Sequence, residues 1–113
     1  ALATMLRFLA GEPELARLCM IEPVAAGGEI AARHRASMQG MVEILKAGRP
    51  ERSGDHPLPE ATEETLVGGI VSLIVREISA GRTAKLEALL PDLVELTLGP
   101  YVGVEEAERL ARV

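Results

Sequence analysis

The sequence predicts an all-α fold of five or six helices. Apolar residues recur at spacings of three and four through most of the chain, and glycine and proline stand where helices should end and begin. No segment shows the strict two-residue alternation of an exposed strand. Because 113 residues with 48% hydrophobic content suit one core, we expect residues 1–113 to form a single domain.

The first quarter of the chain predicts two helices. Apolar residues at helical spacing fill residues 1–10 and stop at Gly11, a natural C-terminal cap. A second helix should run over about residues 12–25, with a proline in its first turn. An interior proline, Pro23, predicts a kink or an early end near Glu22.

The middle of the chain predicts one long helix followed by a loop. The helix should run from residue 29 to 47 and stop at Gly48. Its apolar stripe contains a histidine, His34, close to the centre. The polar, proline-rich residues 48–59 are expected to form a loop.

The last half predicts two double-sided helices, over residues 59–80 and 91–102. Helical turns over 83–89 should separate them, and a short surface helix over 105–112 should follow. The pair Gly68–Gly69 costs helix stability, so we expect another backbone to approach there. Pro100 predicts a bend or a frayed last turn.

Both double-sided helices have more apolar surface than one small core can cover. We therefore expect a homodimer, because a second subunit would cover the remaining side. The predicted interface residues lie on these two helices: Val67, Val71, Ile74, Val75, Ile78, Leu93, Val94, Thr97, Leu98 and Tyr101.

The composition argues against several partners. The net charge is −5, the second half of the chain is acidic, and aromatic residues make up 2%, so this chain alone should not bind nucleic acid. No apolar run approaches 18 residues and no secretory signal is visible, so we expect a cytoplasmic protein without a membrane span. The chain begins at Ala1, inside a helical pattern, which indicates a fragment of a longer protein.

Catalytic and metal-binding motifs are absent from the sequence. There is no phosphate-binding glycine loop, no cysteine or histidine pair at metal-ligand spacing, and no nucleophile turn. We expect neither an enzyme nor a bound cofactor or metal.

Two titratable residues stand on apolar helix faces. His34 is either a core histidine bonded to a backbone carbonyl or to Glu22, or a polar anchor in a ligand pocket. Glu77 should lie at a rim and pair with Arg82 or with an arginine of another subunit. The single cysteine, Cys19, is expected to be buried and inert.

Four segments resemble one family: Phe8–Leu18, Gly68–Ile74, Gly81–Arg82 and Leu89–Val94. Together, and in this order, they are similar to the C-terminal regulatory domain of TetR-family transcriptional repressors. The resemblance implies an orthogonal, antiparallel helical bundle, with helices 59–80 and 91–102 forming an intersubunit four-helix bundle.

The resemblance also implies a function. In such a repressor an N-terminal helix-turn-helix, absent from residues 1–113, would bind DNA, and a small effector held by the C-terminal helices would release the operator. By similarity the pocket would lie among residues 1–10 and the helices beginning near residues 12, 29 and 59.

The effector expected for this pocket is small and largely apolar, since the lining offers flexible or bulky groups and few polar anchors. The same residues would also suit an ordinary core, and the alternative is a purely structural dimerisation domain without a physiological ligand. The candidate pocket residues are Met5, Phe8, Cys19, His34, Ser37, Met38, Met41 and Thr65.

Overall fold

The fold of this chain is helical throughout, which confirms the predicted all-α class. A computed structural model describes residues 2–51 and 57–112, without the side chains of Val24 and Glu51. Every regular element in this part of the chain is an α-helix or a 3-10 helix. Of the helices among these residues, none is long and apolar enough to span a membrane.

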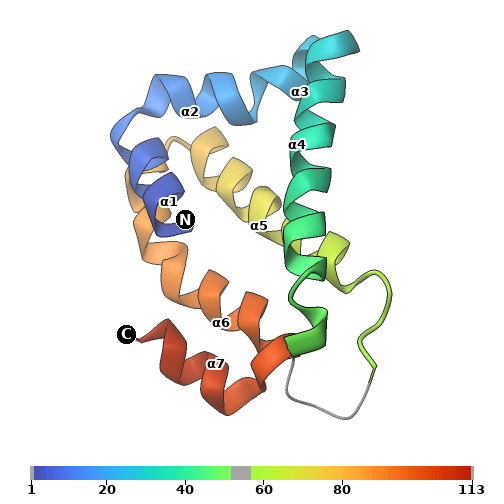
Figure 1. The fold of residues 1–113 in the computed structure, drawn as a ribbon. Coiled ribbons are helices and arrows are strands. Elements are labelled where there is room, and N and C mark those ends of the chain that lie inside the picture. The colour runs from blue at the N-terminus through green and yellow to red at the C-terminus, as the bar shows by residue number, and fades with distance from the viewer. Residues whose placement is uncertain (1, 52–56, 113) are drawn as a thin grey trace.

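The first four α-helices match the predicted pattern closely. The second predicted helix is divided at Ile21, so the expected break near Glu22 is confirmed one residue earlier. In Figure 1, α2 and α3 cross the top of the molecule and lead into α4, which descends along one side. The elements are α1 (Leu2–Gly11), α2 (Pro13–Met20), α3 (Glu22–Ala26) and α4 (Gly28–Lys46).

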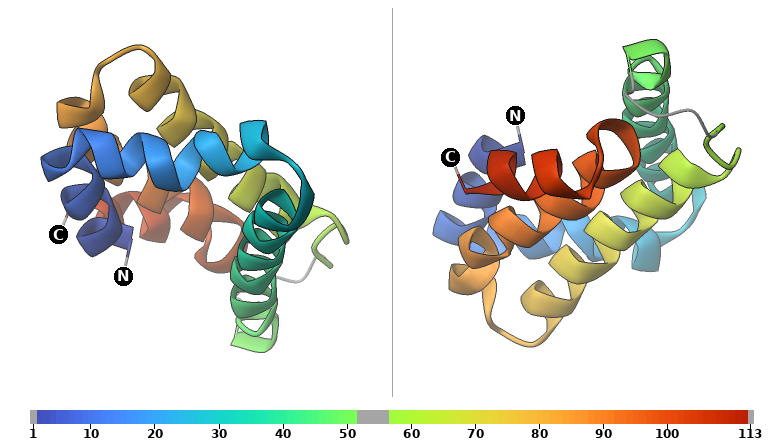
Figure 2. Two further views of the ribbon diagram at one scale, coloured as in Figure 1. Left: turned by 90° about the horizontal axis from the view of Figure 1, so that it is seen from above. Right: turned by 90° about the horizontal axis from the view of Figure 1, so that it is seen from below.

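The second half begins after a connection that the structure describes only in part. The predicted loop 48–59 contains a 3-10 helix, and its residues 52–56 lie outside the described residues. Figure 2 shows α5 and α6 running side by side, with α7 along α6. The elements are η1 (Arg49–Glu51), α5 (Thr62–Ser79), η2 (Thr83–Leu89), α6 (Leu90–Val102) and α7 (Val104–Ala111).

One local expectation was wrong in part. The last turn of α6 is not frayed: it continues through Pro100 to Val102, where the backbone N–H of Gly103 donates to the carbonyl of Gly99 at 3.0 Å. The short surface helix expected next is confirmed as α7, which buries Ala107 against its neighbours and leaves its other side exposed. The carboxyl end of the described chain is therefore part of the packed structure.

The hydrophobic core joins the two halves of the chain. Its fully or nearly fully buried side chains come from α1, α2, α5, η2 and α6: Leu6, Leu9, Ala16, Ile74, Ile78, Leu86 and Leu93. Each of these helices supplies one apolar stripe to the common centre, as amphipathic helices do. α4 contributes no residue to this core, and α5 contributes only one of its faces. α4 and the remaining surface of α5 border the two grooves described below.

Candidate functional site

An apolar groove opens between α1, α4, α5 and α6. We call it the Thr97 groove; its volume is about 280 Å³, and the residue for which it is named is its single polar lining residue. Side chains from the second half of α4 face residues from the first half of α5 across it. The lining residues are Leu2, Met5, Met41, Ile44, Leu45, Val67, Ile70 and Thr97.

A second groove lies further along the same two helices. We call it the His34 groove; its volume is about 540 Å³, and it is bordered by α2, α3, the first half of α4 and the middle of α5. Besides a histidine and an arginine, its walls are apolar. The lining residues are Met20, Ile21, Ala25, Ala31, His34, Arg35, Met38, Val71 and Val75.

The predicted single pocket is thus divided between two grooves. Met5 and Met41 line the Thr97 groove, whereas His34 and Met38 line the His34 groove. The other four candidates lie on the surface and line neither groove: Phe8, Cys19, Ser37 and Thr65.

The exposed candidates correct the sequence-based expectation. Phe8 is 53% exposed, and Cys19 is exposed rather than buried. The Thr65 hydroxyl donates to the carbonyl of Ala61 at 2.8 Å, as helical threonines often do. The family resemblance had suggested these residues as pocket candidates, but in the structure their side chains face solvent.

His34 is not the bonded core histidine that the first expectation described, with a hydrogen bond to a backbone carbonyl or to Glu22. Its side chain is half-buried, and it makes no hydrogen bond to any residue that the structure describes, including Glu22. It lies beside Arg35 on the wall of the groove that bears its name. Of the two alternatives, the position at a cavity is the one that the geometry retains.

Half of the predicted dimer surface is occupied by the chain's own packing. In the isolated chain the following residues are buried, with at most 8% of their surface exposed: Val67, Ile74, Ile78, Leu93 and Tyr101. Side chains with so little accessible surface can add little to a contact with a partner, so these five are not retained in the proposed interface. Val71, Val75 and Thr97 line the grooves, and Val94 and Leu98 remain half-buried on α6.

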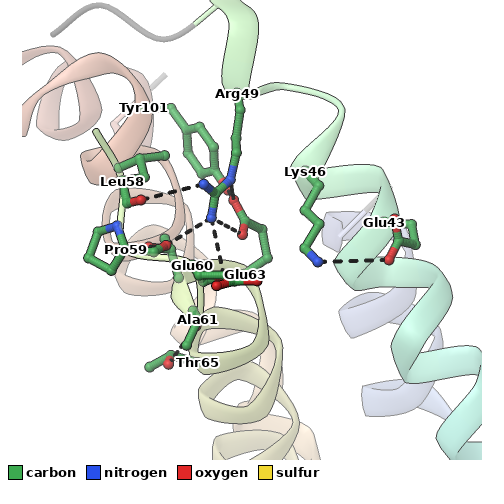
Figure 3. A network of polar contacts seen from close by, with 11 residues as sticks. Glu43, Lys46, Arg49, Leu58, Pro59, Glu60, Ala61, Glu63, Thr65 and Tyr101 are labelled. Carbon is green, nitrogen blue, oxygen red and sulfur yellow. Dashed lines mark hydrogen bonds and ion pairs between the residues drawn. The ribbon is translucent and has the colours of Figure 1, made fainter. Parts of the chain in front are cut away.

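A buried ion pair ties η1, α5 and α6 together (Figure 3). The guanidinium of Arg49 donates to both carboxylate oxygens of Glu63, from Nε at 2.7 Å and from Nη2 at 2.6 Å. The Tyr101 hydroxyl donates to the same carboxylate at 2.9 Å. Arg49 also donates to the carbonyls of Pro59 and Glu60, at 2.8 and 3.3 Å. We call Arg49, Glu63 and Tyr101 the clasp.

The clasp keeps a carboxylate charged in a fully buried position. The hydrogen bonds from Arg49 lower the pKa of Glu63 from an ordinary value of 4.5 to about 2, against the opposing effect of burial, and the Tyr101 hydroxyl adds to the lowering. Burial, followed by the hydrogen bond to Glu63, raises the pKa of Tyr101 to about 12. The carboxylate is therefore ionised and the phenol neutral at any physiological pH.

On α5 and α6 the clasp lies one helical turn from the Thr97 groove. Glu63 precedes Val67 by four residues and Tyr101 follows Thr97 by four, and residues four apart in one helix share a face. Arg49 reaches this end of the groove from η1, just beyond the end of α4. The clasp thus holds one end of the groove at a fixed separation.

The clasp was not predicted from the sequence, because an acidic residue such as Glu63 is ordinary in the first turn of a helix. A signal was nevertheless present. Glu63 lies on the same stripe as Val67, Ile70 and Ile74, at spacings of four, seven and eleven, and this stripe is the buried face of α5. A carboxylate at that position predicts a buried partner.

The expected pairing of Glu77 with Arg82 is confirmed within the chain, although the carboxylate is buried, with 7% of the residue exposed, rather than placed at a rim. Arg82 donates to its carboxylate from Nε at 2.6 Å, and Arg76 donates from Nη2 at 3.0 Å. Both arginines are about half exposed. The pKa of Glu77 is lowered, chiefly by the hydrogen bond from Arg82. These three residues lie at the C-terminal end of α5 and line neither groove.

The described residues contain no group of three or more histidine, cysteine, aspartate or glutamate side chains placed to hold a metal ion. The arrangement offers apolar cavities with isolated polar groups, which suits binding of an uncharged or weakly polar molecule. No family model, curated protein or solved structure matches the chain.

Proposed function

We propose that this chain is the effector-binding and dimerisation domain of a TetR-like transcriptional repressor. The observation that carries the proposal is the pair of apolar grooves bordered by the same two helices, α4 and α5. Concave, mostly apolar sites with a few polar groups are typical of small-molecule binding. The resemblance of four chain segments to TetR regulatory domains supplies the biological setting.

The proposed mechanism couples a groove to a DNA-binding domain that would lie outside residues 1–113. An effector that binds one conformation of the helices more tightly shifts the protein toward it. Reciprocally, operator DNA favours the conformation with lower effector affinity. In a dimer this shift changes the spacing of two DNA-binding domains, which must match the operator half-sites.

The outer face of α5 supports the proposed dimer. A Cβ atom added to Gly68 or Gly69 would meet nothing within 4 Å in the single chain, although each glycine costs a helix about 1 kcal/mol relative to alanine. The approach of a backbone expected at this pair therefore does not occur within the subunit. A second subunit packing against α5 would account for two small residues at this position.

The oligomeric state tests the assembly part of the proposal. Light scattering on a sizing column should give about twice the chain mass of 12.0 kDa. Gly69→Gln, on the outer face of α5, and Leu96→Asp, at a side chain that is 62% exposed on α6, should each yield a monomer. Gly40→Gln is the matched control, because Gly40 is an exposed helical glycine with equal open space.

Ile74→Asp and Leu93→Asp are unsuitable for this test, because they would unfold the core rather than divide a dimer. A wild-type monomer at micromolar concentration would refute the dimer. A dimer that persists in both Gly69→Gln and Leu96→Asp would place the interface elsewhere.

Methionine methyl signals test the sensing part. All four methionines line a groove: Met5 and Met41 line the Thr97 groove, and Met20 and Met38 the His34 groove. In protein labelled with ¹³C at the methionine methyl, an effector should shift one pair of signals and raise the melting temperature with its concentration. The test uses a library of neutral apolar compounds. If none of them changes the methyl signals of either methionine pair or the melting temperature, a purely structural dimerisation domain is favoured.

A further inference from the structure

The walls of the Thr97 groove lack charge. Apart from Thr97, every described residue that lines it has an aliphatic or thioether side chain. A charged molecule entering the groove would lose its hydration without gaining a counter-ion or hydrogen bonds, which is strongly unfavourable. The groove therefore discriminates against ions by the absence of any group that could pair with them.

Thr97 is the exception in both polarity and bonding. Its Oγ1 atom is covered from solvent and has no hydrogen-bond partner among the described residues. Buried hydroxyl groups are ordinarily bonded, because an unpaired one forfeits the hydrogen bonds that it makes to water. The unpaired hydroxyl thus marks a polar requirement that this chain does not itself meet.

The hydroxyl can be presented to the groove by a simple side-chain rotation. Threonine in a helix divides its population between two χ1 rotamers. A rotation of about 120° about χ1 moves Oγ1 into the position that the methyl group or the Cβ hydrogen held. A ligand with a hydroxyl or carbonyl group would favour the rotamer in which Oγ1 meets it.

The volume of the groove limits the ligand further. At about 280 Å³ it lies just below the range of roughly 300–1,000 Å³ that holds drug-sized molecules. A compact ligand of one ring or a short branched chain is the size that fits.

We infer that the Thr97 groove binds small neutral molecules with an apolar body and one hydroxyl or carbonyl group, and that Thr97 selects for that group. This inference rests on the proposed effector-binding function and deepens it by naming the ligand class and the residue that discriminates. The His34 groove, which has a histidine and an arginine on its wall, is assigned no share in this selection.

Four aromatic probes of one size test the inference: benzyl alcohol, toluene, benzylammonium and benzoate. Binding is followed by the ¹³C-methyl signals of Met5 and Met41, with Met20 and Met38 as the internal control for the other groove. In the wild type, benzyl alcohol should shift the first pair more strongly than either ion does. The variants are Thr97→Val, which keeps the shape and removes the hydroxyl, and Thr97→Ser, which keeps the hydroxyl.

Thr97→Val should raise the dissociation constant of benzyl alcohol about five- to tenfold, the effect of one lost neutral hydrogen bond, and change that of toluene less than about twofold. Thr97→Ser should keep the preference for benzyl alcohol. Equal loss of both ligands in Thr97→Val would point to altered packing and overturn the selective role.

Two other outcomes would also overturn the inference. If benzyl alcohol binds Thr97→Val as tightly as the wild type, Thr97 selects nothing, while the proposed effector function stands. If the probes shift only Met20 and Met38, the Thr97 groove is not the site for this ligand class, and sensing would belong to the His34 groove.

Discussion

The Thr97 groove and the His34 groove share α4 and α5 but differ in what closes their other sides. The Thr97 groove is completed by α1, which contributes Leu6 and Leu9 to the core, and by α6, which the clasp ties to α5. Two of its walls are thus anchored, α1 by the core and α6 by the clasp. We therefore expect this groove to keep its shape when empty.

The His34 groove is completed by shorter and more interrupted segments. Its third wall consists of the end of α2 and the five-residue helix α3, which meet at Ile21. Gly27 then separates α3 from α4, and both it and Gly28, the first residue of α4, have positive φ. Among the described residues no buried ion pair ties this wall to α5. The comparison shows that two grooves of similar apolar lining can differ in how firmly their walls are held.

The largest effect on stability is expected from a substitution that breaks the clasp. Arg49→Met leaves the fully buried carboxylate of Glu63 without its ion-pair partner. Removing one member of a fully buried pair costs about 3–5 kcal/mol, and because the Arg49 side chain is 30% exposed we expect the lower end, about 3 kcal/mol. Urea denaturation should show this loss in the free energy of unfolding. The methyl signals of Met5 and Met41 should move more than those of Met20 and Met38, because only the first groove borders the clasp.

Arg33→Met is the matched control for that loss. Arg33 pairs with Glu29 at 2.8 Å, but both side chains are 79% exposed, so the change should cost less than about 1 kcal/mol. If the two arginine variants lose equal stability, the clasp is no stronger than a surface pair and the contrast between the grooves disappears.

Low pH should also weaken the clasp, because it protonates the carboxylate of Glu63. The pKa of Glu63 is about 2 in the folded chain, below its ordinary 4.5, so its contribution is complete above pH 4.5 and is lost as the pH falls toward 2. Denaturation at a series of pH values should show this loss in the wild type. Glu63→Gln should be less stable at neutral pH and should lack this part of the acid dependence, whereas Glu29→Gln should retain it.

The smallest effect on stability is expected from a substitution in the His34 groove. His34→Leu should change the free energy of unfolding by less than about 0.5 kcal/mol, because the ring is half-buried and bonded to no described residue. Thermal and urea denaturation measure it. A loss above about 1.5 kcal/mol would reveal a structural role for the ring that this wall of the groove does not account for.

The helices could be predicted from the sequence because their signals are local. Glycine and proline placed the ends of α1, α2 and α4 within a few residues, and Pro23 indicated the break that occurs at Ile21. The start of α5 was set too early, at Pro59 rather than Thr62, because its acidic first turn was counted from the proline.

The grooves and the clasp could not be predicted in the same way. Periodicity shows which face of a helix is apolar, but it does not show which neighbour covers that face or along what length. Met38 and Met41 lie less than one turn apart on α4, yet they line different grooves because α4 crosses α5 between them. Likewise Ile74 was assigned to a partner subunit although the chain's own core uses it fully.

α1 contributes side chains both to the Thr97 groove and to the hydrophobic core. Leu2 and Met5 line the Thr97 groove, and Leu6 and Leu9, on the same ten-residue helix, are buried in the close-packed centre. Protein interiors compress little, so a guest larger than the free space cannot be accommodated by a shift of Met5 alone. A ligand pressing on Leu2 and Met5 would therefore also press on the core through Leu6 and Leu9, which lie on the same short helix.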